Sequence, residues 1–264
     1  MPADGASNDV DLFGRRPKNK PDWSHRRGEP RGLALSWSIY LMLVTMGSLT
    51  PAMSLGRFEP DVYRPAARIL MALIVVGMCV LWPMLRLTQT VACKSPGGHV
   101  ARDLVVVLLP ALTLTWPQVV LADWPAEVVA ALTVLLIGWG TMTGVVLLCW
   151  RRRGSEGVPG RLVAMAVSLG MVAVAPMVLW RAGVLGTSPP TEAATPGWMW
   201  TPVTSAWEVL RDRGWSGRPA RVGADHWVRA LGLLASACVA FALLVWSCRG
   251  CGPSVSDPRW DLEH

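Results

Sequence analysis

Charged side chains are scarce in this sequence, and its long apolar runs contain almost none of them. Asp, Glu, Lys and Arg make up 16% of the 264 residues, whereas a typical soluble domain carries about 25%. The charges nearest the runs, such as Glu127, Arg181 and Arg229, fall at run ends, where long side chains reach the aqueous boundary. Pumps and ion-coupled carriers need buried ionisable groups along their path. The sequence therefore argues against a self-sufficient proton-coupled carrier.

Histidine and catalytic motifs are missing from the apolar runs as well. The four histidines lie outside them, at His25, His99, His226 and His264. A membrane cytochrome holds its haem through imidazoles within its helices, so this class is excluded. The sequence also lacks paired carboxylates, a Ser-His-Asp set, a phosphate-binding loop and the residues of intramembrane proteases. We therefore expect a protein that is not an enzyme and that has no cofactor.

Cysteine is absent from the segments expected outside the cell, which predicts that there are no structural disulfides. Three of the six cysteines lie within or at the ends of apolar runs, and three lie on the expected inner side: Cys79, Cys149 and Cys238, then Cys93, Cys248 and Cys251. Cys248-Arg-Gly-Cys251 is a weak candidate for a metal site, because zinc usually needs a second cysteine pair. A metal shared across a dimer, acylation at the membrane edge and chance are the alternatives.

Long apolar runs are abundant: 52% of the residues are hydrophobic and the mean hydropathy is +0.37. The clearest run extends from Val128 to Trp150 without a charge, and about 20 apolar residues suffice for a helix to cross a bilayer. Arg151, Arg152 and Arg153 follow at once. Arginines beside a short loop hold a helix end in the cytoplasm, so these three are interpreted as topology anchors.

Six apolar runs predict an all-α fold, a polytopic transmembrane helical bundle. The predicted spans are about 33–55, 66–87, 104–121, 127–150, 162–184 and 227–246. They form one transmembrane domain, 33–248, between a basic N-terminal tail, 1–32, and a C-terminal tail, 249–264. With both tails in the cytoplasm, sixteen of the 25 Lys and Arg residues lie inside, including Arg86, Lys94 and Arg102 at the first inner loop, and nine lie outside. The positive-inside rule favours this distribution. We expect a multi-pass protein of the plasma (inner) membrane.

The net charge of +7 does not indicate a nucleic-acid partner, because most cations flank the apolar runs and no recognition motif occurs. Membrane lipid is the expected partner of these cations. In the N-terminal tail, Asp22 to Arg27 could lie on the membrane surface with Trp23 as an anchor. A disordered tail is the alternative.

Tryptophans are distributed as two interfacial belts require. Four fall near expected inner ends and four near expected outer ends: Trp37, Trp82, Trp150 and Trp246, then Trp116, Trp124, Trp180 and Trp227. Trp139 lies in mid-span, where we expect it to pack between helices.

The longest expected outer segment, 185–226, contains a predicted helix over 201–214. Thr201 suits the N-cap, Pro202 the first helical position and Gly214 the position after the last turn. The helix has an apolar stripe and a polar side: Val203, Ala206, Trp207 and Leu210, opposite Glu208, Arg211 and Asp212. This pattern predicts an amphipathic helix that lies on, or dips into, the outer membrane interface.

Small residues four positions apart favour close approach of two helices. They occur at Gly140 and Gly144 in the fourth span and at Gly232 and Ser236 in the sixth. Either pair could build a homodimer, and packing within one chain is the expected use. Pro110 and Pro117 in the third span and Pro176 in the fifth break helical hydrogen bonds and allow kinks.

The layout resembles the membrane subunit of an ATP-binding-cassette exporter. Six helices with both termini inside are usual in that family. A proline-led amphipathic helix commonly sits between its fifth and sixth spans, as Thr201 to Leu210 does here. The resemblance implies a permease-like subunit that works as a dimer, with the inner loop Thr88 to Arg102 facing a separate cytoplasmic ATPase.

The alternative is a non-transporting scaffold or assembly subunit that binds other integral membrane proteins in a larger complex. A third and weaker hypothesis, a lipid-handling enzyme, lacks visible catalytic residues. The scaffold hypothesis needs stable membrane partners and no ATPase, and the sequence leaves both hypotheses open.

Overall fold

The structure, a computed structural model, describes residues 30–54, 59–88, 96–152, 158–181, 195–212 and 220–249. These residues form helices joined by short connections, and no strand occurs among them. The α-helices are α1 (Pro30–Ser54), α2 (Pro60–Val76), α3 (Trp82–Leu87), α4 (Pro96–Thr115), α5 (Gln118–Leu121), α6 (Ala126–Arg152), α7 (Val158–Leu169), α8 (Ala175–Arg181), α9 (Pro202–Leu210) and α10 (Ala224–Arg249). Two π-helical segments, η2 (Gly77–Leu81) and η3 (Gly170–Val174), and a 3-10 helix, η4 (Pro196–Trp200), complete the described fold.

Six helical stretches are long and apolar enough to cross a membrane. They are Arg31–Thr50, Pro60–Leu87, Pro96–Leu121, Ala126–Trp150, Gly160–Val178 and Ala224–Ser247. The predictions of an all-α fold and of six candidate spans are therefore confirmed. The fourth and sixth predicted spans agree with the structure to within a few residues.

Two predicted helix starts are wrong. The second span begins at Pro60 rather than near residue 66, and the third begins at Pro96 rather than near residue 104. A proline suits the first turn of a helix, because its fixed φ is helical and its missing N–H would have no partner there. Residues 96–102 of the predicted loop from Thr88 to Arg102 belong to α4, and residues 89–95 lie outside the described residues.

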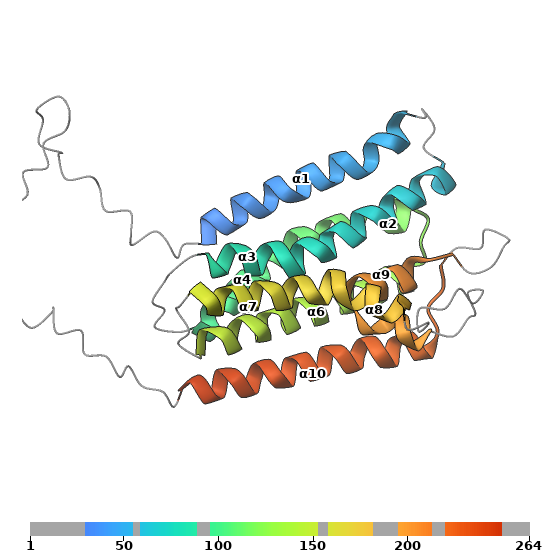
Figure 1. Ribbon diagram of the computed structural model, residues 1–264. Helices are drawn as coiled ribbons and strands as arrows, with labels where there is room; N and C mark the ends of the chain where they lie inside the picture. Colours follow the sequence, from blue (N-terminus) through green and yellow to red (C-terminus); the bar gives the residue numbers. More distant parts are fainter. Residues whose placement is uncertain are drawn as a thin grey trace, which may run out of the picture.

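The helices lie alongside one another around α6 (Figure 1). In an apolar 18-residue window of the fourth span 61% of the residues are buried, against 12% in the fifth span and 11% in the sixth. Both α4 and α10 pack against α6, and α1 packs against α2. The start of α1 and the end of α10 lie at one end of the bundle, called the termini end, whereas α9 lies at the other (Figure 1). Residues 195–212, which include η4 and α9, are called the cap.

Each π-helical segment lies just before a proline in its span. Pro83 follows η2 and Pro176 follows η3, and a proline removes one N–H from the helical hydrogen-bond ladder. Tyr40 on α1 also binds the backbone just before η2, because its hydroxyl donates to the Leu73 carbonyl at 2.7 Å. A side chain at Gly77 would collide with the ring of Tyr40. The irregularity predicted at Pro176 therefore takes the form of a π-helical turn.

Three tryptophans that were predicted to be interfacial anchors belong to the core. Trp37, Trp82 and Trp124 are at most 1% exposed. Trp37 Nε1 donates to the carbonyl of Val107 on α4 at 2.9 Å, so its polar atom is bound within the protein. These side chains fill gaps between helices, a role that proximity to a span end does not reveal.

Candidate functional site

A buried ion pair joins the two helices at the termini end that flank residues 89–95. Arg86 on α3 donates from Nε to Asp103 Oδ2 on α4 at 2.6 Å, and its Nη2 bonds to the second carboxylate oxygen. The two side chains are 5% and 3% exposed. A two-point guanidinium–carboxylate pair fixes orientation as well as distance, so α3 and α4 are held in one relative position.

This pair corrects two predictions. Arg86 had been counted as a cation of the inner loop, and the spans were expected to contain almost no ionisable groups. The helix instead continues to Leu87, and α4 begins early enough to place Asp103 opposite Arg86. The pair therefore lies inside two candidate spans, where neutralisation by a partner offsets the cost of burying each charge.

A second polar cluster lies in the cap and centres on Glu208, which is fully buried. The Arg211 guanidinium pairs with both carboxylate oxygens of Glu208. Its Nε lies 2.8 Å from Oε2 and its Nη2 lies 3.1 Å from Oε1. The Thr195 backbone N–H donates to Oε1 at 3.2 Å. His226 Nε2 on α10 lies 3.8 Å from the same oxygen, and its Nδ1 accepts from the Gly223 N–H. The Glu208 carboxylate thus links both ends of the cap to α10.

The cap is also tied to the two most buried spans. Trp139 Nε1 on α6 donates to Ser205 Oγ at 3.0 Å. Arg68 on α2 donates to the Leu210 carbonyl at 2.9 Å and pairs with Asp212 at 2.5 Å. The Arg68 bond satisfies a carbonyl at the end of α9, one of the groups that a helix C-terminus leaves without a partner.

The start predicted for the amphipathic helix is confirmed, but the expectation that its polar side faces away from the protein is wrong. Thr201 caps α9 and Pro202 occupies the first turn. Of the apolar stripe, Val203 is half-buried, Ala206 and Leu210 are buried, and Trp207 is 36% exposed. The opposite side is buried as well, because Glu208 binds groups within the protein. The helix therefore packs against the end of the bundle through most of its surface, and Trp207 remains partly exposed.

The end predicted for this helix is also wrong, because α9 stops at Leu210 rather than near Gly214. Arg211 is extended, with φ −74° and ψ 143°. Its guanidinium returns to Glu208 and to Thr195 Oγ1, which the extended backbone permits. Gly214 itself lies outside the described residues.

The two pairs of small residues differ in whether other helices of the chain pack against them. A Cβ at Gly140 would lie 3.1 Å from both Leu104 Cδ1 and Met78 Sδ, and one at Gly144 would lie 3.1 Å from Val100 Cγ1. The expected packing within one chain is therefore found in α6. At Gly232 a Cβ would meet nothing within 4 Å, and Ser236 is exposed. The expectation of packing within the chain is wrong for that pair.

The remaining predicted site residues lie at helix ends or beyond them. Arg151 and Arg152 form the last residues of α6, and Arg153 lies outside the described residues. Cys248 belongs to the last turn of α10, whereas Cys251 lies outside the described residues. Trp139 packs between α6 and the cap, as predicted from its mid-span position.

Sequence reasoning missed the Glu208–His226 contact and the Arg86–Asp103 pair. Glu208 and Arg211 are three positions apart, a spacing at which helical charges meet, so their pairing had a local signal. The two longer-range contacts had none, because 18 and 17 residues separate their partners. Within the part of the chain that the structure describes, no group of three or more His, Cys, Asp or Glu residues could hold a metal ion.

The chain was also compared with models of protein families, with curated proteins and with solved structures, and none matched. Its function must therefore be inferred from the residues described above.

Proposed function

We propose that this chain is the permease-like membrane subunit of an exporter energised by a separate ATPase. The observation that carries the proposal is the Arg86–Asp103 ion pair, which clamps together the two helices that flank residues 89–95. A force applied to residues 89–95 by another protein would move α3 and α4 as one unit. Such a rigid connection is what a subunit driven from outside needs.

Two features support a subunit that changes shape. The π-helical segments η2 and η3 lie within the second and fifth candidate spans and contact one another. π-helical turns replace regular i→i−4 bonds and occur frequently at functional sites. Movement of α3 would therefore reach η3 through packed residues.

The filled centre of the bundle favours a pair of subunits. Leu104, Met78 and Val100 pack against the glycines of α6, and α6 itself is largely buried. This packing gives one copy no polar route along its central helix. A route between two copies is consistent with it, so a homodimer is part of the proposal.

Affinity purification from native membranes in mild detergent, followed by mass spectrometry, tests the proposal. An ATP-binding subunit should co-purify at comparable abundance. A photo-cross-linker at Gln89 should capture it, whereas the same cross-linker at Ser188 should not. Purification with integral membrane proteins and no ATPase would contradict the exporter proposal.

The scaffold hypothesis is the second candidate, and the exposed face of α10 favours it. Val228, Leu231, Val239 and Leu243 on this helix are all about half or more exposed, a surface that could bind another membrane protein as well as lipid. Deleting this chain should then lower the amounts of its membrane partners, with no ATPase among them.

The orientation is proposed from the charge distribution: plasma membrane, with both termini in the cytoplasm. A cysteine introduced at Ser188 should react with a membrane-impermeant thiol reagent in whole cells, whereas one at Ser155 should not. The unsubstituted chain gives the background from its own cysteines. The reverse labelling pattern would overturn the orientation.

A further inference from the structure

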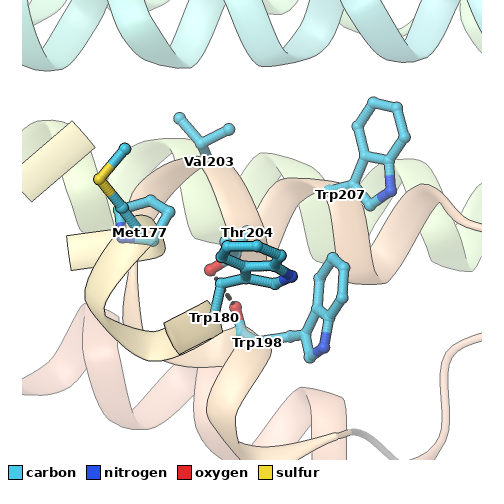
Figure 2. A pocket seen from close by; sticks show the side chains of 7 residues that line it. Met177, Trp180, Trp198, Val203, Thr204 and Trp207 are labelled. Atoms are coloured by element: carbon cyan, nitrogen blue, oxygen red, sulfur yellow. Dashed lines mark hydrogen bonds between the residues drawn. The ribbon is translucent and has the colours of Figure 1, made fainter. Parts of the chain in front are cut away.

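An apolar pocket of about 470 Å³ lies beside the cap (Figure 2). Its walls come from α8, η4 and α9: Met177, Trp180, Trp198, Val203, Thr204 and Trp207. Ligand pockets typically have volumes of about 300–1,000 Å³, so the size suits one small apolar molecule or one chain of a larger one.

The surface that the lining side chains present to the pocket is almost wholly apolar. Thr204 contributes a hydroxyl, which is already used: it donates to the Trp198 carbonyl at 2.6 Å. Figure 2 shows the ring of Trp180 over Thr204, with Trp198 and Trp207 to one side and Met177 and Val203 on the other. Hydrocarbon is therefore the favoured occupant, because a polar ligand would lose its bonds to water without replacement.

The pocket opens toward the surroundings of the bundle. Met177 and Trp180 are each 69% exposed, and Trp207 is 36% exposed. Trp116 and Trp200, at the same end of the bundle, are 48% and 71% exposed. Exposed tryptophans gather at the level of lipid head groups, so an occupant entering from the side meets the pocket near that level.

The arginines near the pocket favour a lipid with one kind of head group over another. Arg181 follows Trp180 at the end of α8, is exposed, and makes no hydrogen bond or ion pair with any residue that the structure describes. An aromatic cage for a quaternary ammonium needs ring faces free of cations, but Arg211 already lies 5.4 Å from the Trp198 ring centroid. An anionic group suits this surface better than a cationic one.

We propose that this pocket binds one acyl chain of an anionic phospholipid and that Arg181 binds its phosphate. The arginine guanidinium matches phosphate geometry with two parallel bonds, while the tryptophan rings bury the chain. The site goes beyond the exporter and scaffold proposals and depends on neither.

The first test uses the full chain in nanodiscs of phosphatidylcholine that contain a phosphatidylglycerol with a photoreactive diazirine in its acyl chain. Peptide mapping should find the label concentrated within residues 176–207. Val203→Phe fills the pocket and Trp180→Ala removes an exposed wall. Each should lower this labelling by roughly tenfold, the order expected for losing the contact of one apolar side chain. Val239→Phe, on the exposed face of α10, is the matched control and should not change it.

Two results would overturn the chain-binding part. One is labelling spread evenly over exposed helix faces, and the other is labelling of residues 176–207 that neither pocket variant lowers. Thermal melting in the same nanodiscs identifies a variant that fails to fold. Trp180→Ala then decides the question if Val203→Phe is unstable, because Trp180 is largely exposed.

The second test concerns the head group. Phosphatidylcholine carries the same phosphate, but its choline cation cancels the negative charge that attracts the arginine. Arg181→Gln should therefore abolish the preference for photoreactive phosphatidylglycerol over a phosphatidylcholine carrying the same chain, while labelling by the phosphatidylcholine probe persists. An unchanged preference would overturn the role of Arg181. No ATPase is present in either test, so the outcome is independent of whether one co-purifies with this chain.

Discussion

The ion pair at the termini end and the Glu208 cluster in the cap bury charge in two different ways. Arg86 and Asp103 join two helices through one guanidinium and one carboxylate. Glu208 instead binds the Arg211 guanidinium and the Thr195 backbone N–H, both in the cap. It also lies near the His226 imidazole on α10. The cluster spreads its interactions over several groups. Losing one charged member should therefore cost the cluster less than the same loss costs the pair.

The largest expected effect is on the pair at the termini end. Asp103→Ala removes the carboxylate and leaves the buried guanidinium of Arg86 without it. Breaking a buried ion pair in this way typically costs about 3–5 kcal/mol. We expect a large fall in the temperature at which the purified protein unfolds in mild detergent, measured by size-exclusion chromatography after heating.

The double variant Arg86→Leu/Asp103→Leu distinguishes the loss of pairing from a general packing defect. Replacing both members of a buried pair with apolar residues is often neutral or stabilising, so the double variant should recover most of the lost stability. If the double variant is as unstable as Asp103→Ala, the ion pair is not the source of the lost stability.

Glu208→Gln should have a smaller effect, because the amide keeps the shape of the side chain and can still accept bonds. Loss of a hydrogen bond to a charged group costs about 1.5–3 kcal/mol. Since Thr195 and Arg211 both bind this carboxylate, hydrogen exchange should accelerate across the cap more than in α6. Glu127→Gln, at an exposed position in the first turn of α6, is the matched control. Equal acceleration in both variants would contradict the role of Glu208.

The glycines test the contrast between a filled and an open helix face. Gly140→Ala places a methyl group 3.1 Å from Leu104 and Met78, and overpacking typically costs about 1–3 kcal/mol. Gly232→Ala meets nothing within 4 Å and should leave the unfolding temperature of the isolated chain unchanged. If Gly232→Ala instead lowers dimer content in native membranes, a second copy packs at that face.

The sequence predicted the elements well, because length and hydropathy are local properties. The run from Val128 to Trp150 required a long apolar helix, and Thr201 with Pro202 marked where α9 begins. Burial was predicted poorly, because it depends on which helices meet. Trp37 at a span end has the same local pattern whether it faces lipid or donates to Val107 on another helix.

The same reasoning explains the error about α9. Its polar side was expected to face water, since an isolated amphipathic helix would place Glu208 there. Arg211 and Thr195 bind that carboxylate, which makes burial tolerable for a charged residue. Thr195 is 13 residues from Glu208, so no pattern within the helix could have indicated this partner.

The smallest expected effect concerns the hydrogen bond from Trp139 on α6 to Ser205 in the cap. Trp139→Phe keeps an aromatic ring but removes the N–H that donates to Ser205. Hydrogen bonds between membrane helices are worth about 0.6 kcal/mol on average, so the unfolding temperature should fall slightly. Trp246→Phe, at an 80% exposed position, should cause no change. Ser205→Ala should lower the unfolding temperature less in the Trp139→Phe background than in the unsubstituted chain, because there it removes only the bond from Ser205 to the Pro202 carbonyl. Fully additive losses would mean that the two side chains stabilise the cap independently, and that the bond between them contributes nothing.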